Sequence, residues 1–353
     1  MIALPRRAWG AELSNDYHQR SRVTAGREFY VLGGLLLAAT VPLVVEVLAD
    51  GGDSVIAVLS KIWNDATGAF TGEIMNAVPV DRGTLTGPVL YWLAIVVMGM
   101  LPVAAAVCFL LVKEPPIPAT VTKVSMKESF SHLIKNGPMV RVLIIVLLVQ
   151  FGESFRNAVS LFFIADIVGV PTIGAAYFFY FVAGLAAIPF WLFLGKKFGK
   201  HKAFMLTLIT VACVSATNFL LVEGDYFVFF LLFIVKGFCF GGLQFLPLAM
   251  LADVVDVDSA RTGGKRAGSY FAILGISEKL AIACGTGFSF FIVGRLGFDP
   301  ALGVDGSTDL GVLTLRLVYC FGPVLFYGLA MKLIWNYPLT PARHARLRET
   351  IAR

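Results

Sequence analysis

Two pairs of ionisable residues interrupt apolar stretches of the sequence, and both have the chemistry to hold an ion or a polar solute. Glu153 and Arg156, in QFGESFRNAVSLFF, are three residues apart, so they share one face of a helix and can pair directly. Glu278 and Lys279, in LGISEKLAIACG, are adjacent and point about 100° apart on a helix, so each needs a partner elsewhere. Inside a membrane, such groups are costly and mark ion or substrate pathways.

Each pair has a functional interpretation and a structural alternative. Arg156 could bind a carboxylate or sugar hydroxyls through two parallel N–H groups, whereas a pair with Glu153 that satisfies itself would be structural. Lys279 lies about 15 Å into its expected span, near the bilayer centre, where a lysine stem cannot readily reach either interface. We therefore expect Lys279 to face a carboxylate across a central cavity and Glu278 to bond to a neighbouring helix.

A basic loop, FLGKKFGKHKAF, joins two apolar runs. Its two glycines let the neighbouring helix ends approach closely, and its lysines can bond the last carbonyls of the preceding helix. One interpretation is an anchor on the inner membrane face. The other is a gating loop that locks helices together in one state of a transporter, with Gly195, Lys196, Lys197, Gly199 and Lys200 as its key residues.

An acidic run followed by a basic pair, MLADVVDVDSARTGGKRAGSYF, ends one apolar run and opens the next. Asp253, Asp256 and Asp258 come first, and Lys265 and Arg266 follow a Gly-Gly turn. We expect the carboxylates to pair with these neighbouring cations and so to hold the inner ends of two helices. A divalent-metal site is the weaker alternative, because no Asp-Gly loop with calcium-binding spacing is present.

The composition indicates what surrounds these residues. The chain of 353 residues is 58% hydrophobic and 15% charged, and its mean hydropathy is +0.80. Its apolar residues gather in runs long enough to cross about 30 Å of hydrocarbon as helices, so the expected fold class is an all-α polytopic membrane protein. Basic loops on one side of the membrane account for the net charge of +6, so no nucleic-acid partner is expected. No His, Cys or Ser–His cluster indicates an enzyme, a metal site or a bound cofactor.

Eight complete spans can be drawn along the sequence. Segments rich in Lys and Arg alternate with segments that hold almost none. The basic segments, including both termini, are therefore expected on the cytoplasmic side of the cell (inner or plasma) membrane. The expected spans are residues 28–49, 88–112, 140–165, 171–195, 203–222, 226–251, 269–294 and 312–336.

The connections divide the chain unevenly. Residues 1–112 would form an incomplete N-terminal bundle, whose long outer loop, 50–87, could lie on the bilayer surface or cap the bundle. Residues 113–138 are expected to be a cytoplasmic linker, in which SMKESFSHLI forms a short amphipathic helix that starts with a capping box. Residues 139–338 would form a six-helix bundle, and residues 339–353 a cytoplasmic tail.

These stretches together resemble the glycoside–pentoside–hexuronide:cation symporters, the melibiose-carrier branch of the major facilitator superfamily. The matching text is ALPRRAWGAELSNDYHQRSRVTAGREF, LGKKFGKHKAF, LADVVDVDSARTGGKRAGSYFAILGISEKLA and YPLTPARHARLRETIA. The third stretch is the most specific, because it orders acids, glycines, a basic pair, an aromatic residue and a buried lysine. The resemblance implies a fold of twelve helices in two six-helix bundles, in which the eight spans would be helices five to twelve.

The resemblance also assigns residues. Lys279 would match the helix-eleven lysine beside the family's cation site, and Arg27 the arginine that opens helix five and approaches the sugar. Gln244 falls near an aromatic position of the sugar carriers on helix ten, where an amide offers hydrogen bonds instead. Asp16 and Arg20 would lie in the cytoplasmic loop after helix four. The expected substrate or ion pathway comprises Lys279, Arg27, Glu153, Arg156, Gln244 and Glu278.

The implied function is a secondary active transporter, a cation-coupled symporter of a sugar, glycoside or other small solute that works by alternating access. It would use Na⁺ or H⁺ as coupling ion, at a site built largely from aspartates on helices two and four, which this chain would lack. A missing N-terminal segment or a partner subunit would then be needed, besides membrane lipids. Two alternatives stay open: a transporter of lipid-like or amphipathic solutes, and a non-transporting remnant or a regulatory or assembly protein.

Overall fold

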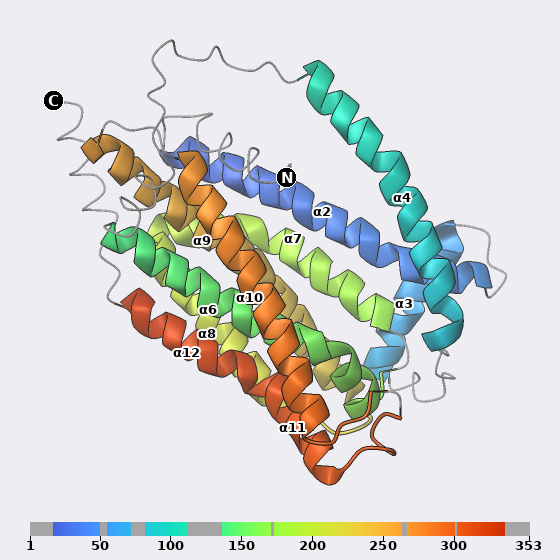
Figure 1. Ribbon diagram of the computed structural model, residues 1–353. Helices are drawn as coiled ribbons and strands as arrows, with labels where there is room; N and C mark the ends of the chain where they lie inside the picture. Colours follow the sequence, from blue (N-terminus) through green and yellow to red (C-terminus); the bar gives the residue numbers. More distant parts are fainter. Residues whose placement is uncertain are drawn as a thin grey trace.

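The protein is all helical wherever its structure is described. A computed structural model describes residues 17–49, 55–71, 82–111, 136–170, 173–262, 267–300 and 302–335, and these ranges contain no strand (Figure 1). This confirms the expected fold class. The main helices are α2 (Tyr17–Ala49), α3 (Val55–Thr71), α4 (Arg82–Leu111), α6 (Gly137–Phe162), α7 (Ile173–Phe198), α8 (Lys200–Thr217), α9 (Tyr226–Thr262), α10 (Ala267–Arg295), α11 (Asp309–Cys320) and α12 (Gly322–Trp335).

Seven helical segments of the described part are long and apolar enough to cross a membrane. They match the second to the eighth expected spans, so the chain is a multi-pass membrane protein. The first expected span, 28–49, lies within α2, which begins earlier than predicted, at Tyr17, and whose apolar stretch is the shorter Phe29–Val41. The seven segments are Gly87–Val107, Gly137–Ile167, Ala175–Phe198, Lys200–Leu220, Tyr226–Val255, Gly268–Arg295 and Asp309–Trp335.

The last six of these spans pack together as a bundle. α6 contacts α10 and α12, and α9 contacts α7 and α8 (Figure 1). The final span is made of two helices, α11 and α12, which meet at Phe321. Pro323 follows directly, and because proline has no backbone N–H it cannot donate a helical hydrogen bond there. Buried apolar side chains, among them Phe204 and Leu246 at one end and Phe163 and Phe229 at the other, form the core.

Glycines bring α7 and α9 into backbone contact. Gly237 and Gly241 stand one turn apart on α9, where a Cβ at Gly241 would come within 2.5 Å of the Gly184 carbonyl oxygen on α7. A Cβ at Gly237 would lie 2.7 Å from the Cα of Tyr180 and overlap its carbonyl oxygen. Small residues at this spacing let membrane helices approach closely. The contact fixes α9, which carries one wall of the site described below.

The N-terminal helices lie along one side of this bundle. α2 packs on α7 and α9, and α3, which forms within the predicted outer loop, contacts α2, α7 and α9. α4 contacts α2 and stands apart from the six-helix bundle in Figure 1, and its apolar window has no buried residue. The amphipathic helix expected near Ser125 lies outside the described residues, so the division into two bundles and a linker stays a prediction.

Candidate functional site

A stripe of polar side chains runs along α6 at the middle of its span. Gln150, Glu153, Ser154 and Asn157 follow the spacing i, i+3, i+4 and i+7, so they share one face of the helix. All four line a pocket of about 300 Å³. The N-terminus of α6 is fixed by Asn136, whose side-chain oxygen accepts a hydrogen bond from the backbone N–H of Met139 at 3.2 Å.

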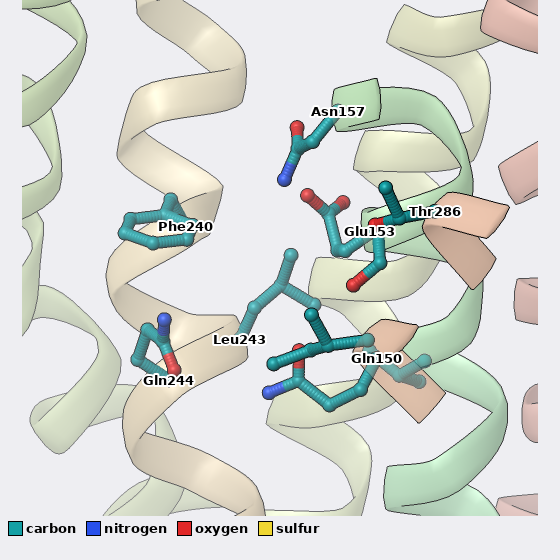
Figure 2. Close-up of a pocket in the computed structure, with 10 residues that line it drawn as sticks. Gln150, Glu153, Asn157, Phe240, Leu243, Gln244 and Thr286 are labelled. Atoms are coloured by element: carbon teal, nitrogen blue, oxygen red, sulfur yellow. The ribbon is translucent and has the colours of Figure 1, made fainter. Parts of the chain in front are cut away.

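Two further helices complete the pocket. α9 contributes Phe240, Leu243 and Gln244, and α10 contributes Ile282 and Thr286. In Figure 2, the α9 side chains lie across the pocket from the polar stripe of α6. The lining therefore mixes one carboxylate, three amides and two hydroxyls with apolar and aromatic groups. Such a lining suits a small solute that has both hydrogen-bonding groups and an apolar face.

The predicted pair of Glu153 and Arg156 is confirmed. Arg156 Nη2 lies 2.9 Å from Glu153 Oε2, and the two residues are only 3% and 6% exposed. The same nitrogen donates to Asn157 Oδ1 at 2.6 Å, and the guanidinium lies 5.6 Å from the ring centre of Tyr319. The Tyr327 hydroxyl, on α12, donates to the other oxygen of Glu153. Glu153 lines the pocket and Arg156 does not, so the arginine holds the carboxylate at the pocket wall.

Glu278 and Lys279 lie on α10, close to the pocket but outside its lining. Lys279 is exposed and Glu278 is half-buried. Lys279 stands one turn from Ile282 and two turns from Thr286, so it shares their side of the helix. The role expected for each of these two residues therefore stays a prediction.

The basic loop and the acidic run meet in the structure. Lys200 Nζ lies 2.7 Å from Asp253 Oδ1 and donates to the Ala249 carbonyl oxygen at 3.2 Å. Asp253 and Ala249 belong to α9, so these contacts tie the start of α8 to that helix. The sequence predicts the partner of Asp253 among the cations that follow it, so the contact with Lys200 differs from that expectation.

The remaining residues of the basic loop surround that pair. Gly195 is buried in the last turn of α7, whereas Lys196 and Lys197 are exposed, and Lys197 lies over two phenylalanine rings. Gly199 joins α7 to α8 with a φ of 93°, a left-handed conformation that glycine adopts without strain. The glycine thus permits the sharp turn that brings Lys200 to α9.

The structure says less about the other predicted residues. Asp256 lies in α9, and Arg20 and Arg27 lie in α2, so Arg20 is helical and not in the expected loop. The side chains of these three are not described. Among the described residues, no group of three or more His, Cys, Asp or Glu could hold a metal ion. Outside the described residues lie Asp16, Lys265 and Arg266.

Sequence reasoning missed three buried residues of the bundle. Tyr319 lies against the Arg156 guanidinium, and Tyr327 donates a hydrogen bond to Glu153. A tyrosine in an apolar span does not by itself indicate such a role. Lys236, in α9, is buried one turn before Phe240, which lines the pocket. A lone lysine within an apolar run, here FFLLFIVKGFCF, is the same signal that pointed to Lys279. The sequence could therefore have indicated Lys236 as well.

Comparison with known proteins places the chain in a family. A family model described as MFS/sugar transport protein matches residues 1–341. A candidate glycoside/cation symporter of Escherichia coli is 22% identical over 72% of this chain and 55% of its own length. A candidate sulfoquinovose importer of Salmonella typhimurium is 24% identical over 69% of this chain and 52% of its own length.

A third relative is a sphingosine-1-phosphate transporter of Xenopus tropicalis, 24% identical over 93% of this chain and 63% of its own length. The chain thus spans about half of the two bacterial relatives and somewhat more of the third. The family model matches nearly the whole chain, and the described helices are those of a multi-pass membrane protein. The chain therefore belongs to the MFS/sugar transport protein family.

Proposed function

We propose that this chain acts in cation-coupled symport of a sugar, a glycoside or another small polar solute by alternating access. The pocket between α6, α9 and α10 is the part of the solute site that this chain supplies. The observation that carries the proposal is the position of the pocket. Glu153 and its amide neighbours stand halfway along an apolar span, where polar groups are expensive unless they serve a solute or an ion.

The names of two bacterial relatives support the proposed class of solute. One is named as a candidate glycoside/cation symporter and the other as a candidate sulfoquinovose importer. Amide side chains such as Gln150 and Gln244 both donate and accept hydrogen bonds, as recognition of sugar hydroxyls requires. The coupling ion would be Na⁺ or H⁺, and no other cofactor is needed.

Lys279 and Arg27 are proposed to face the ion and solute pathway. An exposed lysine halfway along an apolar helix needs a polar partner or water, and Lys279 lies on the side of α10 that lines the pocket. A further segment of the polypeptide or a partner subunit would supply that partner. The distribution of Lys and Arg supports a cell-membrane location with both termini in the cytoplasm.

A second candidate function is transport of a lipid-like or amphipathic solute. The relative named as a sphingosine-1-phosphate transporter aligns with more of this chain than the two bacterial relatives do. Phe240, Leu243 and Ile282 also give the pocket an apolar side that would suit a hydrocarbon chain. In this case the polar stripe of α6 would bind the head group.

Uptake by membrane vesicles that contain the chain tests the proposal. Radiolabelled glycosides and an amphipathic phosphate would be offered with an inward Na⁺ gradient, an inward H⁺ gradient or no gradient. We expect accumulation of a glycoside above its outside concentration with one gradient, and its collapse when an ionophore dissipates that gradient. Lys279→Ala should lower this uptake, because it removes the cation proposed to face the ion site.

Matched vesicles that contain the exposed Lys332→Met variant control for the loss of a lysine. Accumulation of the amphipathic phosphate alone would favour the second candidate function. No gradient-dependent accumulation of any solute would contradict symport and favour a regulatory or assembly role.

A further inference from the structure

Lys236 is a buried cation in the middle of α9. The residue is 2% exposed, and its Nζ makes no hydrogen bond with any described group. The other buried cations of the described part are Arg156 and Lys200, and each of them bonds a carboxylate. Lys236 therefore differs from both, because its amine has no hydrogen-bond partner among the described residues.

Its depth makes this burial expensive. Lys236 comes ten residues after Tyr226, where the span starts, which places it about 15 Å into the hydrocarbon layer. A lone ionisable residue at such a depth faces a pathway or a partner by default, because an apolar side chain would serve packing better. A partner for Lys236 is therefore expected along the face of α9 that this residue occupies.

The residues that follow Lys236 on the same face of α9 line the pocket. Phe240, Leu243 and Gln244 follow Lys236 at i+4, i+7 and i+8, and all three line the pocket. The Tyr180 ring, on α7, contacts Phe233 and Phe240, one turn on either side of Lys236, with centroid distances of 4.9 and 5.4 Å. Lys236 thus lies between two aromatic contacts, next to the α9 wall of the pocket.

The same region contains the buried pair of α6. Phe240, one turn after Lys236, lines the same pocket as Glu153. Glu153 and Arg156 neutralise each other at 2.9 Å. An anionic solute would supply the acidic partner that the Lys236 amine lacks among the described residues.

We propose that Lys236 binds the acidic group of an anionic solute, a carboxylate, sulfonate or phosphate, at the α9 end of the pocket. The inference rests on the proposed function for the idea that the pocket holds a solute, and it adds the charge of that solute. Lys236 itself is not part of the pocket lining, and Phe240, one turn away, is. The proposed contact therefore requires the Phe240 side chain to turn aside when the acidic group binds. The amides of the pocket then bind the uncharged part of the solute.

Equilibrium binding to the purified full chain tests this assignment. The probes are radiolabelled methyl glucoside and its 6-carboxylate, 6-sulfonate and 6-phosphate forms, which differ only at one position of the sugar. Dodecyl phosphate offers the same acidic group on an amphipathic molecule. We expect at least one anionic probe to bind the wild-type chain at least tenfold more tightly than the neutral glucoside, about 1.4 kcal/mol.

Lys236→Met should remove that preference and leave the affinity for the neutral glucoside within about twofold, while Lys236→Arg keeps part of it. Lys332→Met, at an exposed lysine near the end of α12, is the matched control and should change neither affinity. The thermal midpoint of Lys236→Met should not fall, because the variant removes an unpaired buried charge. If Lys236→Met weakens the binding of dodecyl phosphate alone, the site is supported and its solute is identified as amphipathic.

Three results would overturn the inference: no anionic probe binds the wild-type chain, Lys236→Met leaves the preference intact, or all probes weaken equally as the thermal midpoint falls. Failure of the proposed symport is seen separately, as gradient-independent uptake. Lys236-dependent binding without any gradient-driven uptake would keep this site and reject the transport mechanism.

Discussion

Glu153→Gln should destabilise the protein by about 3–5 kcal/mol, the usual result of removing one partner from a buried ion pair. Arg156 would then keep a charge that it cannot lose, in a position that is 3% exposed. The neutral amide of glutamine would offset little of that charge. The measurement is the midpoint of unfolding in mild detergent, followed by size-exclusion chromatography of the heated protein.

The two partners of this pair should not be equivalent. Arg156→Met should destabilise less than Glu153→Gln, because a carboxyl group can take up a proton and keep its hydrogen bond with Tyr327. The double variant should recover most of the loss, since it leaves no unpaired charge. Glu223→Gln, an exposed carboxylate between α8 and α9, is the matched control. Equal midpoints for Glu153→Gln and this control would contradict the buried pair.

Gly237→Ala should destabilise the six-helix bundle by about 3 kcal/mol or more, at the upper end of the cost of overpacking. The new methyl group would overlap the carbonyl oxygen of Tyr180 and lie 2.7 Å from its Cα, both of which are backbone atoms that no rotamer change can move. α7 and α9 would have to separate, and α9 carries Phe240 and Gln244 into the pocket. The yield of monodisperse protein and its thermal midpoint should both fall.

Gly287→Ala is the matched control for this prediction. Gly287 lies within α10, and a Cβ built there meets nothing within 4 Å. Alanine is the better helix former by about 1 kcal/mol, so this variant should be neutral or slightly stabilising. If Gly237→Ala behaved in the same way, the close packing of α7 on α9 would be wrong.

The number and position of most membrane spans could be predicted from the sequence, because hydropathy marks the part of a helix that lies in lipid. The start of α2 could not. Its first turns, YHQRSRVTAG, are polar, and a helix that extends beyond the hydrocarbon layer has no apolar signal there. The sequence also could not indicate how closely α7 and α9 pack, since Gly184 and Gly237 are far apart along the chain.

The candidate site was predictable where its contacts are local. Glu153 and Arg156 pair at i, i+3, which helical spacing alone indicates. Lys200 and Asp253 belong to motifs that the sequence analysis singled out, yet their contact spans 53 residues and depends on how α8 packs against α9. The pocket could not be predicted for the same reason: its walls come from three helices that only the packing of the bundle brings together.

The central claim is that the pocket between α6, α9 and α10 is where this chain binds its solute. The most direct test is the initial rate of solute uptake by vesicles that contain Gln150→Leu or Gln244→Leu, two amides on opposite walls. Thr210→Val serves as the control, because its hydroxyl bonds only within α8 and does not line the pocket.

We predict that kcat/KM falls at least tenfold for each pocket variant at normal protein levels and stays unchanged for the control, because a buried hydrogen bond to the solute is lost. Uptake by both pocket variants at the wild-type rate would contradict the assignment of the solute site.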